Sequence, residues 1–183
     1  MSGARDTKRM FADELETMME RMPLSKVRVG ELCARCGVER RVFYYHFKDK
    51  YDLVAWMFEQ DQQEALTVGA PYTESLYAAS HQRLWERRAF YRRAFEEDTQ
   101  NSIRSYLLEF STRANELALK RYLAVNELSR DRLFMARHFA HGNIGCVIDW
   151  LQGKLQATPA QLAAYMFAGM PRELREAYAY QQD

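Results

Sequence analysis

The chain has 183 residues, of which 48% are hydrophobic, with eight glycines, four prolines and a formal net charge of +1. This composition is typical of a globular protein and excludes a disordered or fibrous one, and the scarcity of Gly and Pro favours long helices with short connections. No apolar run approaches the roughly 20 residues that span a bilayer, and the charged N-terminus has no apolar signal core. The sequence therefore predicts a cytoplasmic protein without membrane association. An odd count of three cysteines argues against a disulfide framework.

Positive charge is concentrated near the N-terminus. Residues 21–50 contain eight basic and three acidic side chains, a net charge of +5, which leaves −4 for the rest of the chain. A basic island in an otherwise mildly acidic protein indicates a polyanionic partner, although a solvated charged surface remains an alternative on charge alone.

Apolar residues at helical spacing predict four helices in the first third of the chain. These helices cover about 6–22, 29–35, 39–46 and 50–66. Pro23 ends the first, Gly37 separates the second from the third, and Asp49 occupies the N-cap position of the fourth with Asp52 three residues later.

Gly69-Ala70-Pro71 is the strongest candidate for a change of module. Further helical patterns cover about 74–97, 102–125, 130–152 and 159–181, and Pro171 should kink or interrupt the last. No convincing strand pattern occurs, so the predicted fold class is all-α, with a helix-turn-helix domain over 1–50 and a helical regulatory and dimerisation domain over 51–183.

Two short helices joined through Gly37 form the pattern of a helix-turn-helix. Gly37 can adopt the left-handed conformation of a sharp turn, and Val38 and Phe43 would anchor the following helix. The side chains expected to point outward are Arg40, Arg41, Tyr44 and Tyr45. Arginine pairs bidentately with guanine, whereas Tyr and Lys reach phosphates, so this helix suits the DNA major groove. Lys50 places a cation beside a helix N-terminus that itself favours a phosphate.

The run Cys-Gly-Val-Glu-Arg-Arg-Val-Phe-Tyr-Tyr-His-Phe-Lys-Asp-Lys-Tyr-Asp-Leu over 36–53 resembles the signature of the tetracycline-repressor (TetR) family. The resemblance implies a three-helix DNA-binding domain, a linking fourth helix and a variable C-terminal regulatory bundle. It implies base or phosphate contacts at Arg40, Arg41, Val42, Tyr44, Tyr45, His46 and Lys50.

Two departures from the family pattern affect the expected contacts. Val42 stands where Thr is usual, which replaces a hydroxyl contact by a methyl contact, as to thymine. Val29 and Gly30 replace polar residues, which shifts phosphate contacts to Lys26 or Arg28.

The segment 137–151 resembles the late helix of the subgroup that contains DhaS-like regulators of dihydroxyacetone kinase operons. We therefore expect a homodimer on double-stranded DNA that pairs through 130–152 and 159–181 and reads a palindrome. Its recognition helices would enter major grooves roughly 34–36 Å apart.

Control of this dimer by a small ligand or by a partner protein is expected, and the candidate lining residues are Phe110, Phe134 and His138. Two alternatives are a co-activator-dependent activator whose bundle docks a protein, and a protein-interaction module that has lost DNA binding. The aromatic residues of the C-terminal half, Phe110 and Phe134 among them, are nevertheless expected to lie mostly in the core.

Other motifs favour structural interpretations. Cys33 and Cys36 form a CxxC without further zinc ligands nearby, and Cys33 falls where the second helix needs a small buried residue. His138 and His141 lack a completing carboxylate, so packing or ligand lining is favoured over metal binding. No phosphate loop, HExxH or nucleophile–base pair occurs, so neither enzymatic activity nor a cofactor is expected.

Overall fold

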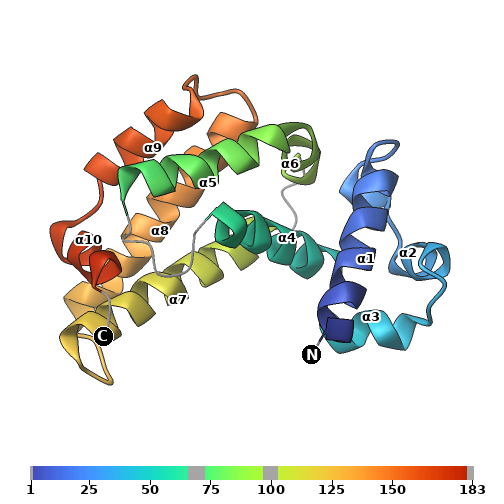
Figure 1. The fold of residues 1–183 in the computed structure, drawn as a ribbon, viewed down its shortest axis with the longest axis horizontal. Helices are drawn as coiled ribbons and strands as arrows, with labels where there is room; N and C mark the ends of the chain where they lie inside the picture. The colour runs from blue at the N-terminus through green and yellow to red at the C-terminus, as the bar shows by residue number, and fades with distance from the viewer. Residues whose placement is uncertain (1, 66–72, 97–102, 181–183) are drawn as a thin grey trace. The chain divides into compact units, whose positions relative to one another are not determined.

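The computed structural model describes residues 2–65, 73–96 and 103–180 (Figure 1). Over these residues the chain forms ten α-helices and one 3-10 turn and no strand, which confirms the all-α prediction. Contacts divide the chain into two compact units, Met1–Gln60 with Arg87–Tyr106, and Asp61–Glu86 with Leu107–Asp183. The predicted domain boundary after residue 50 stays a prediction. Gly69-Ala70-Pro71 and the predicted break at Asn101-Ser102 lie outside the described residues.

The first unit is built around the N-terminal helices. It holds α1 (Ser2–Met19), the 3-10 turn Leu24–Lys26, α2 (Val29–Arg35), α3 (Arg40–His46), the first part of α4 (Lys50–Ala65), and α6 (Arg88–Ala94). Phe43 of α3 is fully buried and meets Phe11 of α1 edge to face at 5.2 Å between ring centroids. Phe47 packs on the same ring at 5.6 Å, so one aromatic cluster holds α3 against α1.

Local interactions form the turn after α2 and the N-cap of α4 in this unit. Gly37 has φ +69°, and the backbone N–H of Val38 reaches the carbonyl of Cys33, so the predicted left-handed turn after α2 is confirmed. Oδ1 of Asp49 accepts hydrogen bonds from the backbone N–H of Tyr51 (2.8 Å) and Asp52 (2.9 Å), which confirms its role as the N-cap of α4. The helix predicted over 6–22 ends earlier, at Met19.

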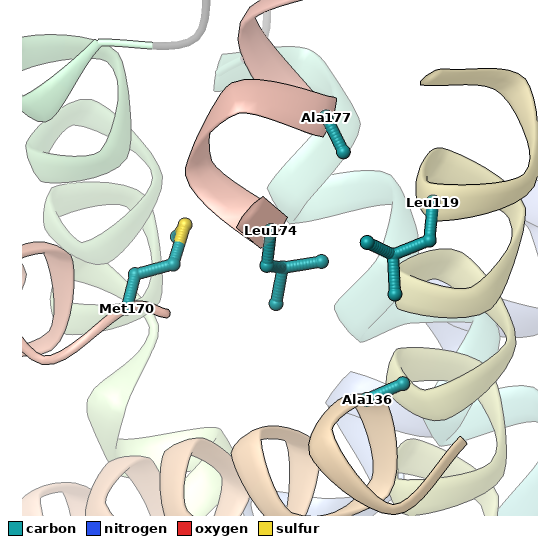
Figure 2. Packing of buried hydrophobic residues seen from close by; sticks show 5 residues of the cluster. All are labelled: Leu119, Ala136, Met170, Leu174 and Ala177. Carbon is teal, nitrogen blue, oxygen red and sulfur yellow. The ribbon is translucent and has the colours of Figure 1, made fainter. Parts of the chain in front are cut away.

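The second unit contains α5 (Glu74–Glu86), most of α7 (Ile103–Leu123), α8 (Arg130–Leu151), α9 (Pro159–Ala168) and α10 (Arg172–Ala179). Helices α5 and α9 lie side by side (Figure 1). One buried cluster joins α10 to α7 and α8, and its members are Leu119, Ala136, Met170, Leu174 and Ala177 (Figure 2). The burial of these apolar side chains fixes the short last helix on the bundle.

Two of the predicted long helices are divided. The pattern over 159–181 breaks before Pro171, as predicted, because proline lacks the N–H that a continuing helix needs. The single helix predicted over 74–97 is wrong, because Arg87 leaves the helical region (φ −101°, ψ 19°) and separates α5 from α6. No Gly or Pro marks this break. Arg87 instead pairs with Glu16 of α1, so a tertiary contact overrides local propensity there.

No helix among the described residues is both long and apolar enough to cross a membrane.

Candidate nucleic-acid interface

Helix α3 turns one side into the core and the other to solvent. Its buried residue is Phe43, whereas Arg40 and Arg41 are exposed, and Tyr44 and Tyr45 are 49% and 85% exposed. The predicted outward orientation of all four side chains is therefore confirmed. Exposed arginine and tyrosine side chains on one side of a helix can hydrogen-bond to the phosphates and base edges of DNA.

Arg41 is held by a weak surface contact. Its Nε lies 2.9 Å from Oε2 of Glu39, and both side chains are largely exposed, at 83% and 73%. Exposed ion pairs contribute about 0–1 kcal/mol, so Arg41 can leave Glu39 for a stronger acceptor at little cost. Such an acceptor is the O6/N7 edge of guanine.

Arg40 has a different environment although it is the next residue in the chain. Its Nη2 donates to the hydroxyl of Tyr44 at 3.3 Å, and the guanidinium lies 5.9 Å from the centre of that ring. Both residues line an open hollow of about 520 Å³ beside the start of α4. Its other polar lining residues are Arg28, Glu31, Asp49, Lys50 and Tyr51.

The hollow combines cations with hydroxyl donors. Arg28, Arg40 and Lys50 outnumber the two carboxylates, and Tyr44 and Tyr51 add hydroxyl groups. This set can bind an anionic oxygen such as that of a backbone phosphate. The structure thus brings together three of the predicted cationic contacts. Tyr51 was missed by sequence reasoning, although it directly follows Lys50 at the start of α4.

Lys50 also has a structural role. Its Nζ donates to the carbonyls of Ser25 (2.9 Å), within the 3-10 turn before α2, and of Val27 (3.0 Å), directly after that turn. The ammonium therefore ties the start of α4 to that turn. Its predicted contact to a phosphate stays a prediction.

The other predicted contact residues differ in their exposure. Lys26 and Arg28 are exposed, whereas Val42 and His46 are half-buried. Burial, and then the charge of Lys8, lowers the pKa of His46, so this ring is neutral at pH 7 and above. Lys8 itself lies over the rings of Phe47 (5.2 Å) and Trp56 (5.6 Å), a position that sequence reasoning missed.

The candidate ligand-lining residues do not share one environment. Phe110 is half-buried on α7, whereas Phe134 is 70% exposed and stacks on exposed His138 at 5.7 Å on α8. The expectation that the C-terminal aromatics pack in the core is therefore wrong for Phe134. It holds for Tyr91 and Trp150, which are buried. Whether any of the three candidates lines a pocket stays a prediction.

Cys33 and His81 are buried, and Cys36 is half-buried. Burial raises the pKa of both the Cys33 and Cys36 thiols, that of Cys36 to about 11, which leaves them protonated and weakly nucleophilic. In the second unit the Nδ1 of His81 lies 2.8 Å from the carbonyl of Tyr77, and its buried Nε2 has no hydrogen-bond partner in the described part of the chain. Over the same residues, no group of three or more His, Cys, Asp or Glu side chains is placed to hold a metal ion.

Comparisons with known proteins agree with this geometry. Residues 16–57 match the family described as "Bacterial regulatory proteins, tetR family", and residues 82–170 match a "Transcriptional regulator C-terminal region". Among solved structures the chain is similar to "Dihydroxyacetone kinase operon activator DhaS", with a TM-score of 0.57 and 16% identity over 90% of this chain and 93% of that one. At that identity the likeness shows a shared fold. No curated protein matches the chain. The exposed α3, the cationic hollow beside it and the two matched regions together establish that the chain belongs to the TetR family of DNA-binding transcriptional regulators.

Proposed function

We propose that this regulator acts as a homodimer that reads a palindromic operator, with α3 of each protomer in the major groove. The observation that carries the proposal is the division of α3 into a buried side, anchored by Phe43, and an exposed side that presents Arg41 and Tyr45. A helix held in this way can enter the groove without unfolding its own core. Two such helices related by a two-fold axis read two half-sites roughly one helical turn apart.

The contacts divide into two classes. Arg41 and Tyr45, at the exposed side of α3, meet base edges, and Val42 adds a methyl contact. Arg28, Arg40, Tyr44 and Lys50, around the hollow, bind the phosphate backbone and set the register of the helix. Lys26 and His46 lie at the edges of the contact and meet the backbone there.

A stripe of exposed residues on α8 is the proposed dimer contact. Phe134, Arg137, His138, His141 and Gly142 are all exposed and recur at the three- and four-residue spacing of one helix face. Apart from the neighbouring backbone of α8, no heavy atom of the described residues lies within 4 Å of a Cβ built at Gly142 or Gly145, so packing within the single chain does not require glycine at either position. Glycine in a helix costs about 1 kcal/mol relative to alanine, and close approach of a second helix offsets that cost. The proposed second copy covers Phe134 as well.

Regulation is proposed to act on the geometry of this dimer. The distance between the two DNA-binding units of the dimer can take more than one value. A small ligand or a partner protein that binds the dimer more tightly at one distance than at another would shift the dimer toward that distance and so change operator affinity. Phe110, half-buried on α7, keeps its place as a candidate for a ligand contact. Phe134 and His138, exposed side by side, fit a protein contact better.

A selection of genomic fragments with purified protein, read by sequencing, tests the proposal. We expect enrichment of one palindromic motif whose half-sites lie about one helical turn apart. Enrichment of a motif without two-fold symmetry would contradict the proposal that the protein binds DNA as a symmetric homodimer. The same protein run by sedimentation velocity, with and without the enriched duplex, should sediment as a dimer on one operator.

A further inference from the structure

The segment Arg87–Tyr106 belongs to the DNA-reading unit although it follows the first eighty residues of the chain. Its residues cluster with Met1–Gln60, while the residues before and after it cluster with the second unit. The segment also lies inside the region that matches a regulator C-terminal domain. The first unit, which presents α3, therefore also contains residues from the region 82–170 that matches a regulator C-terminal region.

Two arginines fasten this segment to α1. Nη2 of Arg87 lies 2.6 Å from Oε2 of Glu16, and Nη1 of Arg93 donates to the carbonyl of Met19 at 2.7 Å. Met19 is the last residue of α1, where carbonyls have no partner within the helix. Arg93 thus caps α1 from a position more than seventy residues away in the sequence.

A third contact reaches the start of α4. The hydroxyl of Tyr106, near the beginning of α7, donates to Oδ2 of Asp49 at 3.0 Å. The other oxygen of this carboxylate accepts the N–H groups of Tyr51 and Asp52. Both oxygens of the N-cap are therefore engaged, one by the helix that it starts and one by α7. Only Phe47 and Lys48 separate Asp49 from the end of α3.

We propose that Tyr106 is a positioning residue for the recognition helix. Its hydroxyl holds the Asp49 carboxylate, the carboxylate fixes where α4 begins, and that point fixes the direction in which α3 leaves the core. Helix α7 continues without a break from Tyr106 to Leu123, so a shift of α7 alters the hydrogen bond that Asp49 receives. Loss of this bond lowers the fraction of molecules in which α3 is oriented for operator binding. Apparent operator affinity falls in proportion to that fraction.

The test variant is Tyr106→Phe, which keeps the ring and removes the hydroxyl. The matched control is Tyr180→Phe, at a 47% exposed tyrosine beyond the end of α10. The inference rests on the proposed operator recognition, so binding to the enriched operator is compared with binding to a scrambled duplex over a range of salt concentrations. Loss of a hydrogen bond to a charged group changes an equilibrium constant by about tenfold. We expect operator affinity to fall about tenfold in Tyr106→Phe, with scrambled-duplex affinity and the salt slope unchanged, and no change in Tyr180→Phe.

A second readout does not depend on DNA. Hydrogen–deuterium exchange of peptides that cover residues 40–58 should be several-fold faster in free Tyr106→Phe than in the wild type or in Tyr180→Phe. Unchanged exchange would overturn the link to Asp49 even if no operator were found. Equal losses on operator and scrambled duplex would overturn the positioning role.

A double variant checks that the two residues act through each other. Serine is a good N-cap but has a single side-chain oxygen, so Asp49→Ser keeps the helix start and removes the acceptor for Tyr106. Adding Tyr106→Phe to Asp49→Ser should then cause no further loss of operator affinity. Additive losses would mean that the Tyr106 hydroxyl acts elsewhere.

Discussion

Arg40 and Arg41 are neighbours in the chain and differ in what they can contact. Side chains of adjacent helical residues point about 100° apart, so Arg40 leans on Tyr44 beside the hollow while Arg41 extends from the exposed side of α3. Arg28, which directly precedes α2, and Lys50 line the same hollow as Arg40. We therefore propose a base-reading role for Arg41 and a backbone role for Arg28 and Arg40.

Substitution of two arginines separates these roles. Arg41→Ala should relax base preference and cost about 1–3 kcal/mol on the best operator, because a bidentate pair to guanine is lost. Arg28→Ala should weaken all sequences alike and lower the salt slope by about one, because one phosphate contact is lost. Titration of the operator and its single-base variants at several salt concentrations measures both. Exchanged phenotypes would show that α3 is oriented differently on DNA.

His81 gives the second unit a pH dependence. Burial lowers the pKa of this ring below its ordinary value of 6.5, and the buried Nε2 has no acceptor to stabilise a second proton. Below about pH 6.5 the unfolded state therefore binds more protons than the native state at this residue, and the free energy of unfolding falls as the pH drops. Above that pH the residue contributes no such dependence.

The variant His81→Phe should remove this part of the acid sensitivity. Phenylalanine keeps an aromatic ring between Tyr77 and Trp150 and cannot take up a proton. Urea unfolding at pH 7.5, 6.5 and 5.5 should show a smaller loss of stability for the variant than for the wild type. His46, whose pKa is also lowered, acts in the same direction and remains in both proteins. His81→Gln checks that the result does not come from packing, and equal pH slopes in all three proteins would contradict the assignment.

Helix ends in this chain follow local chemistry. Thr158 and Gln161 form a capping box at α9, with Pro159 in the first turn. Helix α7 ends differently, because Ala124 has φ +52° and the N–H of Val125 reaches back to the carbonyl of Lys120. This left-handed position is the one that glycine usually occupies after a helix. An alanine there stores strain at the end of α7.

Ala124→Gly should therefore stabilise the protein. Left-handed backbone destabilises an alanine by about 1–2 kcal/mol, and glycine removes that strain. The greater conformational freedom of glycine in the unfolded chain offsets about half of this stabilisation. The net expectation is a free energy of unfolding higher by roughly 0.5–1 kcal/mol, measured by urea unfolding. The control Ala118→Gly, inside α7, should lower it by about 1 kcal/mol. Destabilisation by Ala124→Gly would mean that Ala124 makes contacts worth more than the strain.

At the scale of the whole molecule, the proposed dimer contact on the exposed side of α8 would determine whether one or two copies of α3 meet the DNA. Phe134 is a large apolar side chain left in solvent, and two glycines lie further along the same helix with open space above them. A two-fold contact through this side would place identical residues against each other.

Gly142→Leu tests that contact. A Cβ at this position meets no other part of the described chain within 4 Å, and leucine improves helix propensity, so the protomer should fold normally. In a close-packed dimer the same side chain would collide with the partner copy, and we expect the dimer dissociation constant to rise at least about tenfold. Sedimentation velocity measures this change, with Ala89→Leu, at an exposed position of α6, as the control. An unchanged dimer with normal operator affinity would place the interface elsewhere.

Patterns within a few residues were sufficient to determine much of this protein. Apolar spacing predicts the helices, Gly37 and Asp49 mark the turns around α3, Pro171 divides the last helix, and the motif over 36–53 identifies the family. These features depend on backbone conformation and caps, which neighbouring residues set by themselves.

Tertiary structure decided the rest, because the contacts involved join residues far apart in the chain. The break at Arg87 follows its pairing with Glu16, and the attachment of 87–106 to the DNA-reading unit depends on Arg93 and Tyr106. The separate environments of Arg40 and Arg41, and the engagement of Lys50 with the turn before α2, likewise arise from packing between elements. Periodicity records which side of a helix is apolar and carries no information about which distant residue will meet it.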